Sequence, residues 1–323
     1  DVETSAKRIF TDSDYAAAGC RIMPAGSWVD TPRDTIILGL KELPALPAAL
    51  PHQMIHFAHV YKDQHGWRDE LQRFARGGGR LYDLEYLVDA EGRRKAAFGY
   101  WAGWVGAALA LWRHLARDRG VAGPLNGLNS FENRDALRSE IEALAKGCER
   151  LPSAIVIGAK GRSGQGAVDA LRIACARITE WDKEETTDLD RTALTNHDIL
   201  VNCVLVSGPG LLLLTPETLE RPDQKIRTIS DVSCDPFSDY NPLLIYSKPT
   251  SWARPFVSVG RNGYGEEAEL TAVDNLPSLL PMEASEDFSS QLLASLLAFD
   301  HGPEWRAARD VFERKVRDLE IAG

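Results

Sequence analysis

The chain has 323 residues, which is enough for two domains of ordinary size, each with its own buried core. Its hydrophobic content of 44%, charged content of 26% and mean hydropathy of −0.24 are typical of folded globular proteins and exclude a disordered chain. A formal net charge of −10 argues against nucleic acid and anionic membranes as partners, because phosphate groups are repelled.

Short apolar runs alternate with helical patterns, which predicts an α/β fold with parallel sheets covered by helices. In the first part of the chain we predict strands at 35–40, 54–60 and 80–88 and a helix at 64–75. A helix over 96–117 follows, and its many small residues allow close packing. It is long enough to bridge two domains.

The rest of the chain continues the alternation. A stretch rich in Gly, Asn and Pro over 120–129 predicts a surface loop, and a helix follows at 135–148. The chain ends in two amphipathic patterns that predict helices at 284–298 and 303–319.

The segment from Ala154 to Thr186 carries the pattern of a dinucleotide-binding unit. An apolar strand runs into Gly158, Gly161 and Gly164, then come a helix and a second strand that is closed by Asp182. Glycines let the backbone turn tightly and approach a pyrophosphate, whose charge then lies on free amides at the helix N-terminus. The spacing differs from GxGxxG, so a glycine-rich turn of an unrelated α/β domain is the alternative. The complete order of strand, loop, helix and acid favours a dinucleotide.

The acid at the end of the second strand bears on the choice of dinucleotide. Asp182 is expected to accept hydrogen bonds from ribose hydroxyls and to repel a 2′-phosphate, which favours NAD over NADP. Two later strands, predicted over 197–206 and 225–232, end at positions where ligands of open sheets usually bind. Beyond the second of these strands the candidates are Ser233, Cys234 and Asp235, and Asp274 is a further one.

Charged residues also follow the strands predicted in the first part of the chain. Lys41 and Glu42 follow the first strand, His59 closes the second, and Glu85 lies in the third. Such groups can converge at one edge of a sheet and form a catalytic site, although solvated loop residues are the alternative.

Histidine and cysteine spacing argue against a metal site. His52 and His56 have the spacing of two zinc ligands on a helix, but the segment is better interpreted as a strand, and no nearby cysteine completes a ligand set. Five widely spaced cysteines without a CxxC pair are typical of free thiols in a reducing compartment. We find no secretory signal, no peroxisomal ending and no apolar run of the roughly 18 residues that a membrane span needs. We therefore expect a cytoplasmic protein, and we expect it to be a monomer.

Sequence blocks along nearly the whole chain resemble the NAD-dependent, lysine-forming saccharopine dehydrogenases of the fungal α-aminoadipate route. Blocks this long and in this order are far more specific than a glycine pattern. They are PAGSW at 24–28, GLKELP at 39–44, HFAHVYKDQ at 56–64, LYDLEYL at 81–87, GRRKAAFGYWAG at 92–103, IGAKGRSGQGA at 157–167, EWDKEET at 180–186, ISDVSCD at 229–235 and DNLPSLLPMEAS at 274–285.

The resemblance implies two Rossmann-like domains with the active site in the cleft between them. Residues 1–97 and 281–323 would form the substrate domain, and residues 98–280 the NAD-binding domain. The implied reaction is the reversible conversion of saccharopine, NAD and water to L-lysine, 2-oxoglutarate and NADH, the final step of lysine biosynthesis, in which an imine is formed and then hydrolysed.

The resemblance also assigns roles to residues. Lys41 matches the base that takes the proton from the secondary amine, and His59 matches the group that serves imine hydration and collapse. The implied substrate-binding residues are Glu42, Lys62, Glu85, Arg94, Phe98, Ser233, Cys234 and Asp235. The implied cofactor-binding residues are Arg93, Gly158, Gly161, Arg162, Ser163, Gly164, Asp182, Thr186, Leu205, Val232, Val273, Asp274, Asn275 and Leu276.

Three features depart from the family pattern. Ahead of the position of Asp1 the family has a strand and a helix with an arginine that grips a substrate carboxylate, so we expect the chain as printed to expose apolar surface and to hold a dicarboxylate weakly. Ser163 replaces a cysteine that can bridge to the partner matched by Cys203, so that bridge cannot form here. Leu205 replaces a tyrosine near the cofactor.

Two other hypotheses remain at this point. The chain could be a non-catalytic NAD-binding homologue, although the presence of both Lys41 and His59 argues against simple decay. It could also be an amino-acid dehydrogenase of the alanine dehydrogenase type, which would not need the blocks at 56–64 and 274–285.

Overall fold

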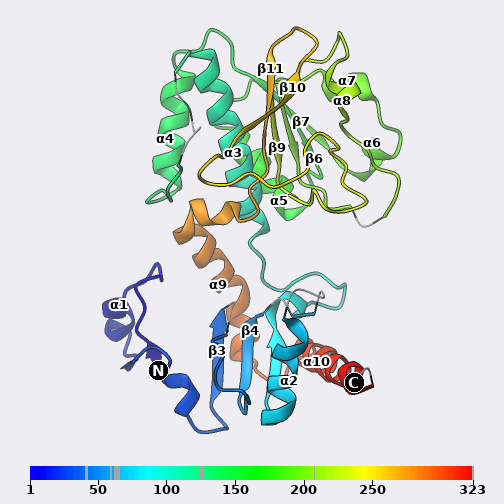
Figure 1. Cartoon of the computed structure of the whole chain (residues 1–323). Helices are drawn as coiled ribbons and strands as arrows, with labels where there is room; N and C mark the ends of the chain where they lie inside the picture. Colours follow the sequence, from blue (N-terminus) through cyan, green and yellow to red (C-terminus); the bar gives the residue numbers. More distant parts are fainter. Residues whose placement is uncertain are drawn as a thin grey trace. The chain divides into compact units, whose positions relative to one another are not determined.

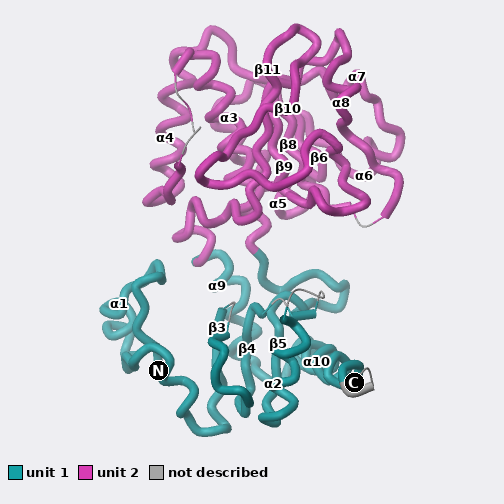
Figure 2. The backbone as a smooth tube through the Cα atoms, in the orientation of Figure 1, with its two compact units in different colours: residues 1–97, 286–323 teal, residues 98–285 magenta. Residues whose placement is uncertain are grey.

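The computed structural model describes residues 1–40, 43–58, 60–61, 66–121, 123, 127–206 and 208–321. The chain divides into two compact units (Figure 2), residues 1–97 with 286–323 as unit 1 and residues 98–285 as unit 2. The helix that crosses the boundary is α9 (Pro281–Leu297). The long helix α3 (Gly99–Asp118) lies wholly in unit 2.

Unit 2 is built on a six-stranded sheet with the strand order β10-β11-β9-β8-β6-β7. Neighbouring strands are parallel except for β10 and β11, which form an antiparallel pair at one edge. This is the α/β architecture that the sequence predicts. The strands are β6 (Ser153–Ile157), β7 (Arg177–Trp181), β8 (Ile199–Asn202), β9 (Thr228–Asp231), β10 (Val257–Arg261) and β11 (Glu267–Thr271).

Helices cover both faces of the unit 2 sheet (Figure 1). Alternate residues of β6 show this, since Ala154 and Val156 pack in the core on the α3 side, while Ile155 and Ile157 pack in the core on the opposite side. A strand that is buried on both faces is therefore apolar throughout. The helices are α3, α4 (Arg134–Ala145), α5 (Arg162–Leu171), α6 (Lys183–Thr187), α7 (Arg191–Thr195) and α8 (Pro216–Leu219), with a 3-10 turn at Leu276–Leu279.

Unit 1 contains a smaller parallel sheet with the strand order β3-β4-β5. The predicted strands exist, but β5 ends at Asp83, because the Asp83 carboxylate accepts a hydrogen bond from the Glu85 amide (3.0 Å) and begins a 3-10 turn. The elements are β1 (Val2–Glu3), α1 (Asp12–Ala17), β2 (Ile22–Met23), a 3-10 turn at Ser27–Asp30, β3 (Ile36–Leu40), β4 (Gln53–Phe57), α2 (Trp67–Gly77), β5 (Arg80–Asp83), a 3-10 turn at Leu84–Tyr86, α9 and α10 (Pro303–Ile321).

Two apolar clusters fill unit 1, one on each face of its sheet. Tyr82 and Trp305 belong to one cluster, and Phe74 and Phe312 belong to the other. The edge strand β3 leaves large apolar side chains in contact with solvent, at exposures of 48% for Ile36, 59% for Leu38 and 62% for Leu40. Within the described ranges, no helix is both long and apolar enough to cross a bilayer.

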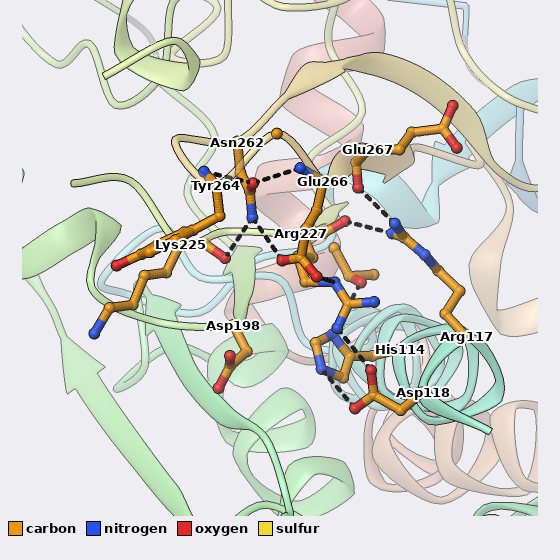
Figure 3. Close-up of polar contacts among 12 residues, drawn as sticks. His114, Arg117, Asp118, Asp198, Lys225, Arg227, Asn262, Tyr264, Glu266 and Glu267 are labelled. Atoms are coloured by element: carbon orange, nitrogen blue, oxygen red, sulfur yellow. Dashed lines mark hydrogen bonds and ion pairs between the residues drawn. The ribbon is translucent and has the colours of Figure 1, made fainter. Parts of the chain in front are cut away.

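Charged groups join the C-terminal end of α3 to the N-terminal edge of the unit 2 sheet (Figure 3). The Arg113 guanidinium forms a buried two-pronged ion pair with Glu269 on β11, at 2.7 and 2.8 Å. Arg227, just before β9, pairs with Asp118 on α3 at 2.6 Å. These pairs link residues more than a hundred positions apart in the chain and fix α3 on the sheet.

His114 lies inside this network and titrates abnormally. It is 1% exposed, its Nδ1 lies 3.3 Å from Thr228 Oγ1, and its Nε2 lies 3.5 Å from Asp118. Burial lowers the pKa of His114 to about 4, since it outweighs the nearby Asp118 and Asp198 carboxylates, while Arg227 and Arg117 lower the pKa further. The folded protein therefore holds this imidazole neutral at neutral pH.

We expect His114 to make the protein acid-sensitive between about pH 6.5 and 4. Below the unfolded-state pKa of 6.5, His114 binds a proton in the unfolded chain but stays neutral in the folded chain. The free energy of unfolding therefore decreases as the pH is lowered, by up to about 3 kcal/mol. Urea unfolding at pH 7 and pH 4.5 measures this loss. His114→Gln should show a smaller loss, whereas His301→Gln, which changes an imidazole at 90% exposure, should match the wild type. Equal losses in all three proteins would contradict the assignment.

Candidate functional site

A glycine loop connects β6 to α5 at the C-terminal edge of the unit 2 sheet. Gly158 has a φ of +80°, and a Cβ atom there would lie 2.7 Å from the Val204 side chain, so this position requires glycine. The amides of Gly158 and Ala159 donate to the Trp181 carbonyl at 2.8 and 3.0 Å, which ties the loop to β7.

Helix α5 begins at Arg162, with Gly161 as the residue before its first turn. Gly161, the residue before the first turn, has no side chain that could cap this end of the helix. Amides in the first turn of a helix can donate hydrogen bonds to an anion. The sequence predicts that the helix begins after the glycines, but Arg162, Ser163 and Gly164 all belong to its first turn. The close approach that glycine allows and the N-terminus of α5 together suit a pyrophosphate.

Asp182 lies at the C-terminal end of β7, beside the glycine loop. Its carboxylate accepts hydrogen bonds from the amides of Lys160 (3.0 Å) and Lys183 (2.8 Å), and it caps helix α6. These amide hydrogen bonds, that of Lys183 first, hold the pKa of Asp182 below its usual value. The carboxylate is therefore ionised at neutral pH. Thr186 follows in α6, and its hydroxyl donates to the Asp182 carbonyl at 2.8 Å.

The other candidate residues of unit 2 follow β8, β9 and β11. Because these strands run parallel to β6, their C-terminal ends meet at the same edge as the glycine loop. After β8, Leu205 is 66% exposed. After β9 come Val232, Ser233, Cys234 and Asp235, all partly buried, and after β11 come the buried Val273, the exposed Asp274 and Asn275, and the buried Leu276.

All five cysteines are described, and all are free thiols, as the sequence predicts. Two of them lie at this edge of the sheet, Cys203 and Cys234. Burial is the main factor that raises the pKa of both thiols, that of Cys234 to about 12, so both are protonated at neutral pH.

In unit 1 the described candidates are Glu85, Arg93 and Arg94. The Glu85 carboxylate is buried and pairs with the Arg94 guanidinium at 2.7 Å, which supplies the partner that a buried charge needs. Arg93 is exposed and pairs with Asp89 at 2.9 Å. Arg93 belongs to unit 1, whereas the glycine loop belongs to unit 2. Phe98 is the residue just before α3, in unit 2.

The remaining candidates of the first part of the chain, Lys41, Glu42, His59 and Lys62, lie outside the described residues. His56 is in β4, and His52 directly precedes it, with its Nε2 3.2 Å from the Thr31 hydroxyl. The strand interpretation of this segment is therefore confirmed. In the part of the chain that the structure describes, no three His, Cys, Asp or Glu side chains are grouped so that they could hold a metal ion.

The structure also shows two polar residues that the sequence analysis did not single out. Asn202 ends β8 and Asp231 ends β9, and both are fully buried. The signal that could have found them is their position as polar residues closing apolar strands at the ligand edge.

A family model and a solved structure both relate this chain to alanine dehydrogenases. The family model "Alanine dehydrogenase/PNT, N-terminal domain" matches residues 1–105. A solved L-alanine dehydrogenase structure has a TM-score of 0.66, covering 99% of this chain and 90% of that one at 17% identity, which concerns the fold alone.

Relatives in fungi are much closer in sequence. Saccharopine dehydrogenase (NAD(+), L-lysine-forming) of Neurospora crassa is 43% identical over 99% of this chain and 88% of its own length. The enzyme of the same name from Schizosaccharomyces pombe is 40% identical over 98% of this chain and 90% of its own length. The chain therefore belongs to the saccharopine dehydrogenase (NAD(+), L-lysine-forming) family.

Proposed function

We propose that this chain catalyses the reversible, NAD-dependent oxidative deamination of saccharopine to L-lysine and 2-oxoglutarate, the final step of lysine biosynthesis by the α-aminoadipate pathway. The observation that carries the proposal is the identity of about 40% to enzymes of that name over nearly the whole chain. The glycine loop, the N-terminus of α5 and Asp182 support it, because they fit NAD.

In this proposal all the cofactor-binding groups except Arg93 belong to unit 2, and the substrate-binding groups come from both units. The pyrophosphate would lie on the amides at the start of α5, and the Asp182 carboxylate would accept hydrogen bonds from ribose hydroxyls. Bound NAD supplies the hydride acceptor. Lys41 takes the proton from the secondary amine of saccharopine, and His59 serves the hydration and collapse of the imine.

The remaining groups bind and orient the substrate. Glu85 and Arg94 form a charge pair in which Glu85 is buried and Arg94 is partly exposed, and both can respond to a charged substrate. The proposed set is completed by Glu42, Lys62, Phe98, Ser233, Cys234 and Asp235. We further infer that the protein acts in the cytoplasm as a monomer with no nucleic-acid or membrane partner. Light scattering of the purified chain would test its oligomeric state.

A direct assay tests the reaction. The chain is mixed with L-lysine, 2-oxoglutarate and NADH, and the absorbance of NADH is followed. Oxidation that requires both organic substrates is expected. NADH binding without oxidation would instead indicate a non-catalytic homologue, and oxidation with pyruvate and ammonia would indicate an activity of the alanine dehydrogenase type.

We also expect Asp182 to determine the choice between NAD and NADP. The change Asp182→Ser removes a carboxylate that would repel a 2′-phosphate, so the preference for NADH over NADPH should fall about 10- to 100-fold. Fluorescence titration with each cofactor measures the ratio of dissociation constants. Glu184→Gln, which removes an exposed carboxylate of the same helix, is the matched control and should keep the ratio. An unchanged ratio in Asp182→Ser would contradict the role.

A further inference from the structure

Asp231 is a buried carboxylate at the C-terminal end of β9, the edge of the sheet that carries the glycine loop. Its Oδ1 accepts hydrogen bonds from the Ser233 hydroxyl (2.6 Å), the Ser233 amide (3.2 Å) and the Cys234 amide (3.4 Å). A side chain that accepts from the amides two and three residues ahead fixes the turn that follows it. Asp231 therefore determines the path of the loop after β9.

The same carboxylate is joined to the loop after β8. The Asn202 amide group donates to Asp231 Oδ1 (3.0 Å), to the Ser233 hydroxyl (3.2 Å) and to the Val204 carbonyl (3.3 Å). The Asn202 carbonyl oxygen accepts from the Val204 amide at 3.2 Å. Because Val204 in turn contacts Gly158, the loops after β6, β8 and β9 form one connected set.

Two further contacts hold this set in place. The Tyr246 hydroxyl donates to Asp231 Oδ2 at 2.6 Å, so every described contact of the carboxylate comes from a donor. Burial, followed by the Asp231 carboxylate, raises the pKa of Tyr246, which keeps its hydroxyl protonated. Cys234 has a φ of +47°, a conformation that residues other than glycine rarely adopt, and its thiol lies 3.0 Å from the Ala272 carbonyl. A strained residue persists only where its surroundings fix it.

We propose that Asp231 is a positioning residue that presets the loops after β8 and β9 for the nicotinamide half of the dinucleotide. The inference rests on the proposed function. In a doubly wound sheet the two halves of a dinucleotide lie on either side of the point where the strand order reverses. Here β6 and β7 carry Asp182 for the adenosine half, so β8 and β9 face the nicotinamide half. Loops that are already ordered lose less freedom when the ligand binds.

The test compares two ligands and two variants at one position. NADH needs both halves of the site, whereas ADP-ribose lacks the nicotinamide. Asp231→Ala removes the acceptor for every donor, so the NADH dissociation constant should rise about tenfold while that for ADP-ribose changes less than about twofold. Asp231→Asn keeps an oxygen toward Ser233, Cys234 and Asn202 and can donate its amide to Tyr246. It should bind NADH nearly as well as the wild type.

Three results would overturn the inference. Equal weakening of NADH and ADP-ribose would show a general structural role, and a loss in Asp231→Asn as large as in Asp231→Ala would show that charge matters instead of position. A wild-type chain that binds ADP-ribose but not NADH would overturn the proposed function and the inference with it.

If Asp231→Ala does not fold, a second variant tests the same inference. Tyr246→Phe removes only the donor to Oδ2, so the NADH dissociation constant should rise about threefold and that for ADP-ribose should not. No change for either ligand in this variant would overturn the inference.

Discussion

Replacement of Lys41 by Met is expected to lower kcat about 10²- to 10⁴-fold, the usual contribution of a general base, while the NADH dissociation constant stays within about twofold of the wild type. The reason is that the proposed base takes a proton from the substrate amine, whereas the groups proposed to hold the cofactor, apart from Arg93, belong to unit 2. Methionine keeps the length and the apolar stem of lysine and removes the amine. Steady-state assays and NADH fluorescence titration measure the two quantities separately.

The matched control is Lys7→Met, which changes an exposed lysine of the same unit and should leave both quantities unchanged. The pH profile provides a second readout, since loss of the base should remove the limb of kcat that rises with pH. A Lys41→Met enzyme with a normal rate would remove the assignment of this residue as the base. A variant that also loses NADH binding would point to a role in folding or cofactor binding.

The sequence predicted best those parts of the fold whose interacting residues are close together in the chain. The apolar run before the glycines, the glycines themselves and the acid after the next strand all belong to one unit whose parts are neighbours in sequence. β7 (Arg177–Trp181) therefore ends directly before Asp182 as predicted, and the glycine segment lies between a strand and a helix as expected. The start of α5 was misplaced because glycine is a poor helix former, while the tight approach to neighbouring backbone requires it there.

Contacts between distant parts of the chain account for what the sequence did not reveal. No bounds were predicted for β11, because Glu267 and Glu269 make it unlike a buried strand. Glu269 is nevertheless 6% exposed and is neutralised by Arg113 and Arg117 from α3. Those partners could not be predicted from the residues near Glu269, because they lie more than about 150 positions away in the chain. In the candidate site, Asp231 depends in the same way on Asn202, 29 positions away.

Gly103→Ala is expected to destabilise unit 2 by about 3 kcal/mol or more, the upper part of the range for overpacking. Helices α3 and α5 pack so closely that a Cβ atom at Gly103 would lie 1.7 Å from the Ser163 carbonyl oxygen, and that oxygen belongs to the backbone and has little freedom to move. The two helices would have to separate, and the first turn of α5, where the pyrophosphate is proposed to bind, would move with them.

Thermal unfolding and NADH titration measure the two consequences of the Gly103→Ala change together. A loss of about 3 kcal/mol should lower Tm by roughly 6–12 °C for a unit of this size, and NADH should bind more weakly at temperatures where the variant is still folded. Gly208→Ala is the control for the melting temperature alone, since a Cβ atom at Gly208 meets no described atom within 4 Å but Gly208 lies in the loop after β8. If Gly103→Ala melted within 1 °C of the wild type, α3 and α5 could not be packed as closely as described. If it melted early but bound NADH normally, the first turn of α5 would not depend on α3, and the cofactor end of this helix would be set by the glycine loop alone.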